Sequence, residues 1–232
     1  MNVGIIGAMN VELERIIERI ENAHTSEYAG MQFTSGIIGT TPVVVAFCKV
    51  GKVNAAICAQ ALISTFDVTH IINTGVAGSL DARINIGDLV VSTDAVHHDM
   101  DVANLGYALG QVPGMDTLAF PTDEALGQLI TQTAQRLYPE IAVYRGRVAS
   151  GEQFVRTNDV KQHIAGEFGA LCTEMEGAAI AHTCYLNKIP CVIVRAISDK
   201  ADGSDAQDYP VFEERAAQRC AAITLAALEQ LA

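Results

Sequence analysis

Carboxylate side chains follow several short apolar runs of this chain, at the points where buried strands are expected to end. Glu12, Glu174, Glu176 and Asp199 each come within a few residues of such a run. In open α/β sheets, ligands bind beyond the carboxyl ends of the strands. We therefore expect these acids to meet at one edge of a sheet and to form a polar site there. The runs that precede them are 3–8, 171–172 and 191–197.

Each of these carboxylates has a chemical interpretation and a structural one. Asp199 would end an otherwise apolar strand, so partial desolvation would raise its pKa and suit it to donate a proton. Glu12 falls in the first turn of an expected helix, where the helix dipole favours any carboxylate. Glu174 and Glu176 stand at a strand-to-helix junction, where either one could simply cap the helix that follows. From the residues alone, Asp199 is the best catalytic candidate.

Other chemistries have weaker support in the residue pattern. His97, Asp99 and Asp101 would face one way in an extended segment and resemble a metal site, but the remaining histidines are scattered, and a polar loop is the favoured interpretation. Gly4-Ile5-Ile6-Gly7 lacks the third glycine of a dinucleotide fingerprint. No G-x-S-x-G elbow of a serine hydrolase occurs. We therefore expect no metal, no Rossmann oxidoreductase and no serine hydrolase.

The six cysteines, at 48, 58, 172, 184, 191 and 220, form no C-x-x-C pair. Several of them lie inside apolar segments, as buried small hydrophobic residues do. This pattern predicts reduced thiols in a cytoplasmic protein and excludes zinc binding through paired thiolates.

Charge and hydropathy narrow the range of partners. The 232 residues include 15 Lys and Arg against 27 Asp and Glu, which gives a net charge of −12. Nucleic acids and anionic membranes both require basic patches, so neither is an expected partner. No apolar run approaches the roughly 18 residues of a membrane span. The first residues do not combine a basic region with an apolar stretch, so we expect no signal peptide.

Apolar runs of strand length alternate with helical periodicity through most of the sequence. This alternation predicts one α/β domain over residues 1–232, with a mixed central sheet flanked by helices. The glycine-bearing segment 75–87 is expected to be a loop between two strands. Strands are expected at 3–8, 33–38, 43–48, 70–74, 89–92, 143–150 and 191–197, and helices at 10–20, 54–65, 124–137, 159–168, 177–186 and 211–231.

Three motifs stand in order at three of the expected strand ends. They are Gly4-Ile5-Ile6-Gly7-Ala8-Met9 with Glu12, then Thr173-Glu174-Met175-Glu176-Gly177-Ala178-Ala179, then Arg195-Ala196-Ile197-Ser198-Asp199. Together they resemble the purine nucleoside phosphorylase/nucleosidase superfamily and, more closely, the bacterial 5′-methylthioadenosine/S-adenosylhomocysteine nucleosidases. The resemblance runs nearly end to end, and further matching segments are 71–75, 98–102 and 106–114.

The resemblance implies a nucleoside phosphorylase-like fold and hydrolysis of the N-glycosidic bond between adenine and a 5′-substituted ribose. The substrates it implies are 5′-methylthioadenosine, S-adenosylhomocysteine and 5′-deoxyadenosine. It further implies a homodimer whose second subunit completes the pocket for the 5′-substituent, with no metal and no organic cofactor.

The resemblance also assigns roles to individual residues. Asp199 corresponds to the acid that protonates adenine N7, Glu12 to the base that activates water, and Glu176 to the carboxylate that holds the ribose 2′- and 3′-hydroxyls. Substrate-binding positions that carry over are Met175 beneath the ribose, Phe154 stacked on adenine, the Val155 backbone at the base edge, Arg195 near Glu12, Ser198 beside the acid, and Val76, Ala77 and Gly78 beside the ribose.

The pocket for the 5′-substituent involves four more positions. Leu105, Tyr107 and Pro113 correspond to the stretch that the second subunit contributes, and Tyr209 to an aromatic residue near the same pocket. One departure from the family pattern is Val76, which stands where relatives have a serine beside the ribose and the water. This difference bears on substrate breadth, because none of the three carboxylates is lost.

Three alternatives remain open at this point. A phosphorylase on the same fold would place an arginine where this chain has Asn73, and Glu12 would repel phosphate. Cleavage of aminodeoxyfutalosine in the same kind of pocket is a second candidate activity. A nucleoside-binding module without catalysis is the third, and it would be expected to lack a carboxylate that is present here.

Overall fold

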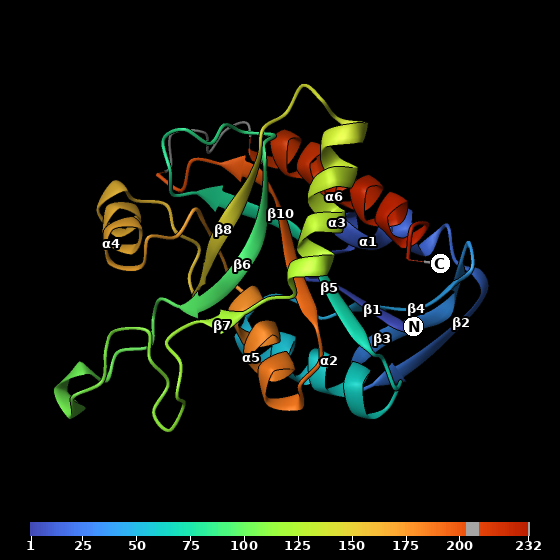
Figure 1. Ribbon diagram of the computed structural model, residues 1–232, viewed down its shortest axis with the longest axis horizontal. Helices are drawn as coiled ribbons and strands as arrows, with labels where there is room; N and C mark the ends of the chain where they lie inside the picture. The colour runs from blue at the N-terminus through green and yellow to red at the C-terminus, as the bar shows by residue number, and fades with distance from the viewer. Residues whose placement is uncertain (203–208, 232) are drawn as a thin grey trace.

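The computed structural model describes residues 1–202 and 209–231, except for the side chains of residues 209 and 210 (Figure 1). Within this part of the chain, ten strands form one sheet. The strands are β1 (Val3–Gly7), β2 (Glu21–Tyr28), β3 (Met31–Ile38), β4 (Thr41–Phe47), β5 (His70–Ser79), β6 (Leu89–His97), β7 (Phe120–Pro121), β8 (Val143–Ser150), β9 (Cys172–Glu174) and β10 (Cys191–Asp199). The helices are α1 (Asn10–Ile17), α2 (Lys52–Ser64), the 3-10 turn η1 (Ala103–Leu105), α3 (Glu124–Leu137), α4 (Asn158–Phe168), α5 (Gly177–Asn187) and α6 (Tyr209–Leu228).

The centre of the sheet is parallel. β1 pairs with β4 on one side and with β5 on the other, and β5 also pairs in parallel with β10. β10 then joins β6, which continues through β8 and β9 back to β5, so these five strands close on one another. β1 joins this ring to β4, and β4, β3 and β2 continue outward as an antiparallel tail. The mixed sheet that the sequence predicts is therefore confirmed.

Helices cover both faces of the sheet (Figure 1). On one face, α1, α3 and α6 pack over a core that includes Ile5, Leu13 and Ile223. On the other, α2 and α5 pack together over a core that includes Ile6, Leu62 and Ile193. Ile5 and Ile6 point to opposite faces because side chains alternate along a strand. β1 is buried along its whole length, as expected for a central parallel strand.

Several segments differ from the sequence-based expectation. β7 and β9 lie where no strand was expected, β6 continues to His97 beyond the expected end at 92, and α1 ends at Ile17 instead of residue 20. Residues 75–79 were expected to begin a loop, but they continue β5, which is held by pairing with β10 and β9. β2 was not expected at all, because its residues are polar and almost all exposed and lack alternation of apolar and polar side chains. The glycines of this segment, Gly75 and Gly78, lie within β5 close to side chains of the site described below.

Among the helices of residues 1–202 and 209–231, none is both long and apolar enough to cross a bilayer.

Candidate active site

A cavity of about 160 Å³ lies where the carboxyl ends of the central parallel strands meet. Strand β9 and the loop after β8 close it from the opposite side. The cavity therefore brings together segments that lie as far apart in the sequence as α1 and β10. The predicted site residues that line it are Glu12, Val76, Ala77, Gly78, Phe154, Val155, Met175, Glu176, Ser198 and Asp199.

Glu12 is held in place by backbone N–H groups from two elements. Its Oε2 accepts hydrogen bonds from Ala8 N at 2.7 Å and Met9 N at 2.9 Å, and its Oε1 accepts from Val76 N at 3.2 Å. The side chain is buried. Burial raises the pKa of this carboxyl above its ordinary value, although Arg195 and the three N–H groups oppose the rise. Glu12 is thus a fixed carboxylate with increased affinity for a proton.

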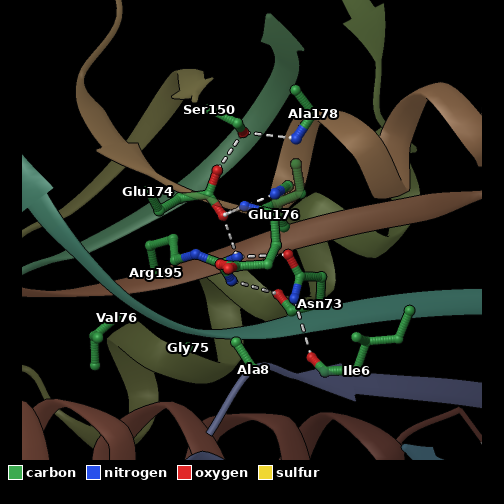
Figure 2. A network of polar contacts seen from close by, with 12 residues as sticks. Ile6, Ala8, Asn73, Gly75, Val76, Ser150, Glu174, Glu176, Ala178 and Arg195 are labelled. Atoms are coloured by element: carbon green, nitrogen blue, oxygen red, sulfur yellow. Dashed lines mark hydrogen bonds and ion pairs between the residues drawn. The ribbon is translucent and has the colours of Figure 1, made fainter. Parts of the chain in front are cut away.

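Beneath the cavity, Arg195 is buried and fully engaged with protein groups at both terminal nitrogens (Figure 2). Its Nη2 donates to Glu174 Oε2 and to Asn73 Oδ1, each at 2.6 Å. Its Nη1 donates to the carbonyl oxygens of Asn73 at 3.2 Å and Val194 at 3.1 Å. Burial alone would lower the pKa of Arg195, but the surrounding carboxylates outweigh it and keep the pKa above its ordinary value.

Glu174 caps helix α5 and binds the arginine at the same time. Its Oε2 also accepts from Glu176 N at 3.1 Å and Gly177 N at 2.8 Å, and its Oε1 accepts from the Ser150 hydroxyl. Ser150 Oγ in turn accepts from Ala178 N at 2.7 Å, so both residues serve the first turn of the helix (Figure 2). Burial would raise the pKa of Glu174, but the guanidinium and these hydrogen bonds hold it below its ordinary value. The capping interpretation of Glu174 is confirmed.

Glu176 differs from Glu174 in that it has little compensation for its burial. Its Oε1 accepts one hydrogen bond, from Gly51 N at 2.8 Å. Burial and the neighbouring Glu174 charge raise the pKa of Glu176 to about 8, with a further contribution from Glu12, against the opposing effects of Gly51 and Arg195. Two adjacent carboxylates therefore have pKa values pushed in opposite directions, a pattern typical of functional sites.

Asp199 is fixed at the end of β10 by the residues on either side of it. Ser198 Oγ donates to Asp199 Oδ2 at 2.9 Å, and Ala201 N donates to Oδ1 at 2.7 Å. Ser198 is buried and also lies 3.4 Å from the carbonyl oxygen of Ala77 on β5. The side chain of Asp199 itself is partly buried and reaches the cavity.

Two glycines of β5 make room for the carboxylates. A Cβ atom on Gly75 would lie 2.5 Å from Glu12 Oε1, and one on Gly78 would lie 2.8 Å from Asp199 Oδ1. Glycine within a strand often marks a close approach of this kind. Gly75 and Gly78 therefore let β5 pass directly beneath both acids.

Apolar side chains form the remaining walls. Met175 and Val155 line the cavity, and Val155 is buried. Phe154 and Val50 also line it, yet they remain 55% and 48% exposed. The cavity thus combines acids at its base with an apolar rim that opens to the surface.

The structure does not gather all the predicted residues in the cavity. Arg195 lies behind its wall rather than in its lining. Leu105, Tyr107 and Pro113 belong to the segment around η1, which extends away from the sheet at the lower left of Figure 1. Leu105 is 67% exposed. The prediction for Tyr209 concerns a side chain outside the described part of the chain.

Sequence reasoning missed other residues of the site. Gly51 supplies the N–H group that holds Glu176, while Val50 and Gln153 contribute to the walls. Asn73, considered only for the arginine that it replaces, binds Arg195. These residues match no motif. The sequence could have indicated them only by position, because Val50 and Gly51 follow β4, Gln153 follows β8 and Asn73 lies within β5.

The arrangement suits a reaction that develops positive charge in the cavity. Carboxylates converge on it from three elements, and among the residues that the structure describes the lining contains no Lys or Arg. In a site with little water, oriented negative groups stabilise a developing cation strongly. Glu12 fixed by backbone N–H groups, Glu176 with its raised pKa and Asp199 at the end of β10 are three separate carboxyl groups of the kind that general acid–base catalysis uses.

Comparisons with known proteins agree with this geometry. The family model of the phosphorylase superfamily matches residues 2–229. The 5′-methylthioadenosine/S-adenosylhomocysteine nucleosidase of Treponema pallidum is 41% identical, with 100% of this chain and 94% of that protein covered. The crystal structure of the nucleosidase of the same name from Neisseria meningitidis, in complex with methylthio-immucillin-A, superposes with a TM-score of 0.94 at 35% identity and 99% coverage of both chains. Futalosine hydrolase of Helicobacter pylori superposes with a TM-score of 0.93 at 32% identity, over 99% of this chain and 98% of that one. This chain therefore belongs to the phosphorylase superfamily and, within it, to the 5′-methylthioadenosine/S-adenosylhomocysteine nucleosidases.

Proposed function

We propose that this protein hydrolyses the N-glycosidic bond of 5′-methylthioadenosine, S-adenosylhomocysteine and 5′-deoxyadenosine, and releases adenine. The observation that carries the proposal is the convergence of Glu12, Glu176 and Asp199 on one cavity. The full-length similarity to nucleosidases supports it. Such an activity would place the protein in methionine salvage.

In the proposed mechanism, Asp199 donates a proton to N7 of adenine, because the base is a poor leaving group until it is protonated. Ser198 and Ala201 orient the carboxyl group through the two hydrogen bonds described above. Phe154 stacks on the base, and the backbone of Val155 meets the base edge. General acid catalysis of this kind typically contributes about 10²–10⁴-fold.

Loss of the base leaves a ribose with oxocarbenium character, and the carboxylates of Glu176 and Glu12 act on the ribose and on the attacking water. Glu176 binds the 2′- and 3′-hydroxyls while Met175 lies beneath the ring. Glu12 removes a proton from the attacking water, a role supported by its raised pKa and its fixed orientation. Val76, Ala77 and Gly78 line the ribose side, and Val76 offers the water no side-chain hydroxyl.

Water is the proposed nucleophile in place of phosphate. Phosphate recognition relies on Arg and Lys side chains, whereas Arg195 is already bound to Glu174 and Asn73 beneath the cavity. Adenine release from methylthioadenosine in phosphate-free buffer tests this point. Full activity without phosphate is expected. A requirement for phosphate together with formation of a ribose 1-phosphate would overturn the hydrolase assignment.

The working unit is proposed to be a homodimer. Ligand pockets usually enclose about 300–1,000 Å³, so a cavity of about 160 Å³ in one chain is small. Its rim is apolar and exposed, and on α2 Val53 and Ile57 are 70% and 43% exposed on one helical face. A second copy docked here would supply Leu105, Tyr107 and Pro113 to the pocket for the 5′-substituent. Sedimentation at micromolar concentration tests for the dimer.

A second candidate substrate is aminodeoxyfutalosine. The likeness to futalosine hydrolase of Helicobacter pylori favours it. The open rim of the cavity would admit a 5′-substituent larger than a methylthio group. Parallel measurements of kcat/KM for methylthioadenosine and aminodeoxyfutalosine decide which of the two is the main substrate.

A reducing, cytoplasmic location fits the state of the thiols. All six cysteines are free and buried. Burial raises the pKa of Cys58 to about 12, so its thiolate is disfavoured. We therefore propose that the protein lies in the cytoplasm, and cell fractionation should recover it in the cytoplasmic fraction.

A further inference from the structure

Three loops near the cavity are joined by a cycle of hydrogen bonds that the proposed chemistry does not use. Lys52 Nζ donates to Asp99 Oδ1 at 2.5 Å, and Glu152 N donates to Asp99 Oδ2 at 2.8 Å. Lys52 N closes the cycle by donating to Glu152 Oε1 at 2.8 Å. These residues come from the start of α2, the loop after β6 and the loop after β8. Asp99 therefore binds two segments through its two oxygens.

The ion pair within this cycle is sheltered. The side chains of Lys52 and Asp99 are 18% and 25% exposed. Burial would raise the pKa of Asp99, but the Lys52 ammonium and the Glu152 N–H group hold it below its ordinary value. Hydrogen bonds between ionised groups are about twice as strong as neutral ones. The cycle is thus a strong link between segments that are distant in the sequence.

The links continue from the cycle to two walls of the cavity. Gly51, next to Lys52, donates its N–H to Glu176 Oε1. Phe154 lies two residues after Glu152 and lines the cavity. The packing at this point is close, because a Cβ atom on Gly51 would lie 2.9 Å from Glu152 Oε2, and Gly51 has a φ of +103°. A shift of either loop would therefore move the partner of Glu176 or the aromatic wall.

We propose that Asp99 and Lys52 are positioning residues of the nucleosidase, which hold the Gly51 N–H group and the Phe154 segment in the geometry that binds the nucleoside. The inference rests on the proposed function, in which Glu176 binds the ribose and Phe154 stacks on the base. Neither Asp99 nor Lys52 lines the cavity. They act through Gly51 and Glu152.

The test is a double-mutant cycle on adenine release from methylthioadenosine by the full-length protein. Asp99→Asn and Lys52→Met should each raise KM about ten-fold, the effect of roughly 1.4 kcal/mol, with kcat changed less than about three-fold. Such a change is expected when an interaction serves substrate and transition state equally. The double variant should be no worse than either single one. Lys52→Arg, which retains a cation for Asp99, should restore KM.

Asp94→Asn is the matched control. Asp94 forms an ion pair with Arg147 at 2.6 Å, its side chain is 25% exposed like that of Asp99, and neither residue lines the cavity. It should lower the thermal midpoint and leave KM unchanged. If Asp99→Asn behaves in the same way as Asp94→Asn, the positioning role is wrong and the ion pair only stabilises the fold. If the two single effects on KM simply add, Asp99 and Lys52 do not act as a pair, and the proposal is overturned as well.

Hydrogen exchange gives a readout that does not depend on turnover. In Asp99→Asn, peptides that cover 48–54 and 151–156 should exchange faster than in the wild type, while peptides of α3 should not change. Unchanged exchange in both loops would overturn the inference. If the wild type releases no adenine, the proposed function fails, and the exchange measurement still decides whether the cycle holds the loops.

Discussion

Replacement of Gly75 by alanine tests whether the position of Glu12 limits the reaction. Gly75 lies inside β5 and does not adopt the left-handed backbone conformation that favours glycine. The substitution therefore adds one methyl group with little backbone strain. That methyl group would lie 2.5 Å from Glu12 Oε1, 3.0 Å from its Cδ and 3.4 Å from Arg195 Nη1. The change is a steric displacement directed at the proposed base.

The size of the effect follows from the contacts of Glu12. Real Cβ contacts essentially never fall below 3.0 Å, so Oε1 must retreat by at least 0.5 Å, the difference between 3.0 and 2.5 Å. Since Ala8 and Met9 hold Oε2, the carboxylate has to turn away from Val76 N and lose that 3.2 Å hydrogen bond. A lost hydrogen bond costs about 1–2 kcal/mol of stability. A misplacement of about 1 Å can cost about 10²-fold in rate, so a retreat of half that distance is expected to cost about ten-fold.

The assay compares kcat for adenine release with the free energy of unfolding. Gly75→Ala should lower kcat at least about ten-fold and reduce stability by only about 1–2 kcal/mol. Gly166→Ala is the matched control, because a Cβ atom at that position on α4 meets nothing within 4 Å. It should leave kcat unchanged and add about 0.5–1 kcal/mol of stability. If folded Gly75→Ala turned over within about three-fold of the wild type, short of the roughly ten-fold loss expected for a base displaced by 0.5 Å, the constrained-base reasoning would be refuted.

Three further predictions address the other parts of the site. Asp199→Asn should reduce turnover by at least about 10²-fold while circular dichroism shows an intact fold; unaltered activity would contradict its role as the acid. Glu174→Gln should move the acidic limb of the kcat/KM profile to lower pH. Burial and the Glu174 charge raise the pKa of Glu176, and activity that needs ionised Glu176 is lost as the pH falls through that pKa, so removal of the charge lowers the limb. A limb that stays in place would count against this coupling. Tyr107→Ala should raise KM for methylthioadenosine more than for adenosine, whereas equal effects on both nucleosides would argue against a pocket shared between subunits.

Much of the fold could be predicted because its strands are either buried apolar runs or alternate regularly. The helix expected at 124–137 and the strand expected at 143–150 have the observed bounds. β2 gave no such signal, since it is stabilised by pairing with β3 rather than by burial of its side chains. The end of β5 differs from the loop that the sequence predicts, because its glycines resemble those of a turn. These positions require glycine because the carboxylates of Glu12 and Asp199 approach the strand closely, and this approach is not visible in the sequence.

The site, like the fold, could be predicted where the signal is local in the sequence and could not where it depends on contacts between distant residues. Carboxylates at strand ends could be located from the sequence, because one edge of the sheet collects them. The groups that change the pKa values of these carboxylates could not be located in this way. Arg195 and its partner Glu174 are 21 residues apart in the sequence, and Gly51 and its partner Glu176 are 125 residues apart. Local patterns contain no information about such pairs. The sequence therefore indicates Glu174 as a possible helix cap but contains no sign of its hydrogen bond to Arg195.

The closed ring of strands has a consequence for how copies of this chain avoid unwanted association. Ring closure pairs β5, β10, β6, β8 and β9 with one another and leaves β2 at the free end of the strand path. An unpaired strand edge is a template for sheet extension and aggregation, which charged side chains discourage. β2 contains Glu21 and Glu27 and is exposed along most of its length. The polar, charged β2 thus discourages the addition of a strand from another copy of the chain at this edge of the sheet.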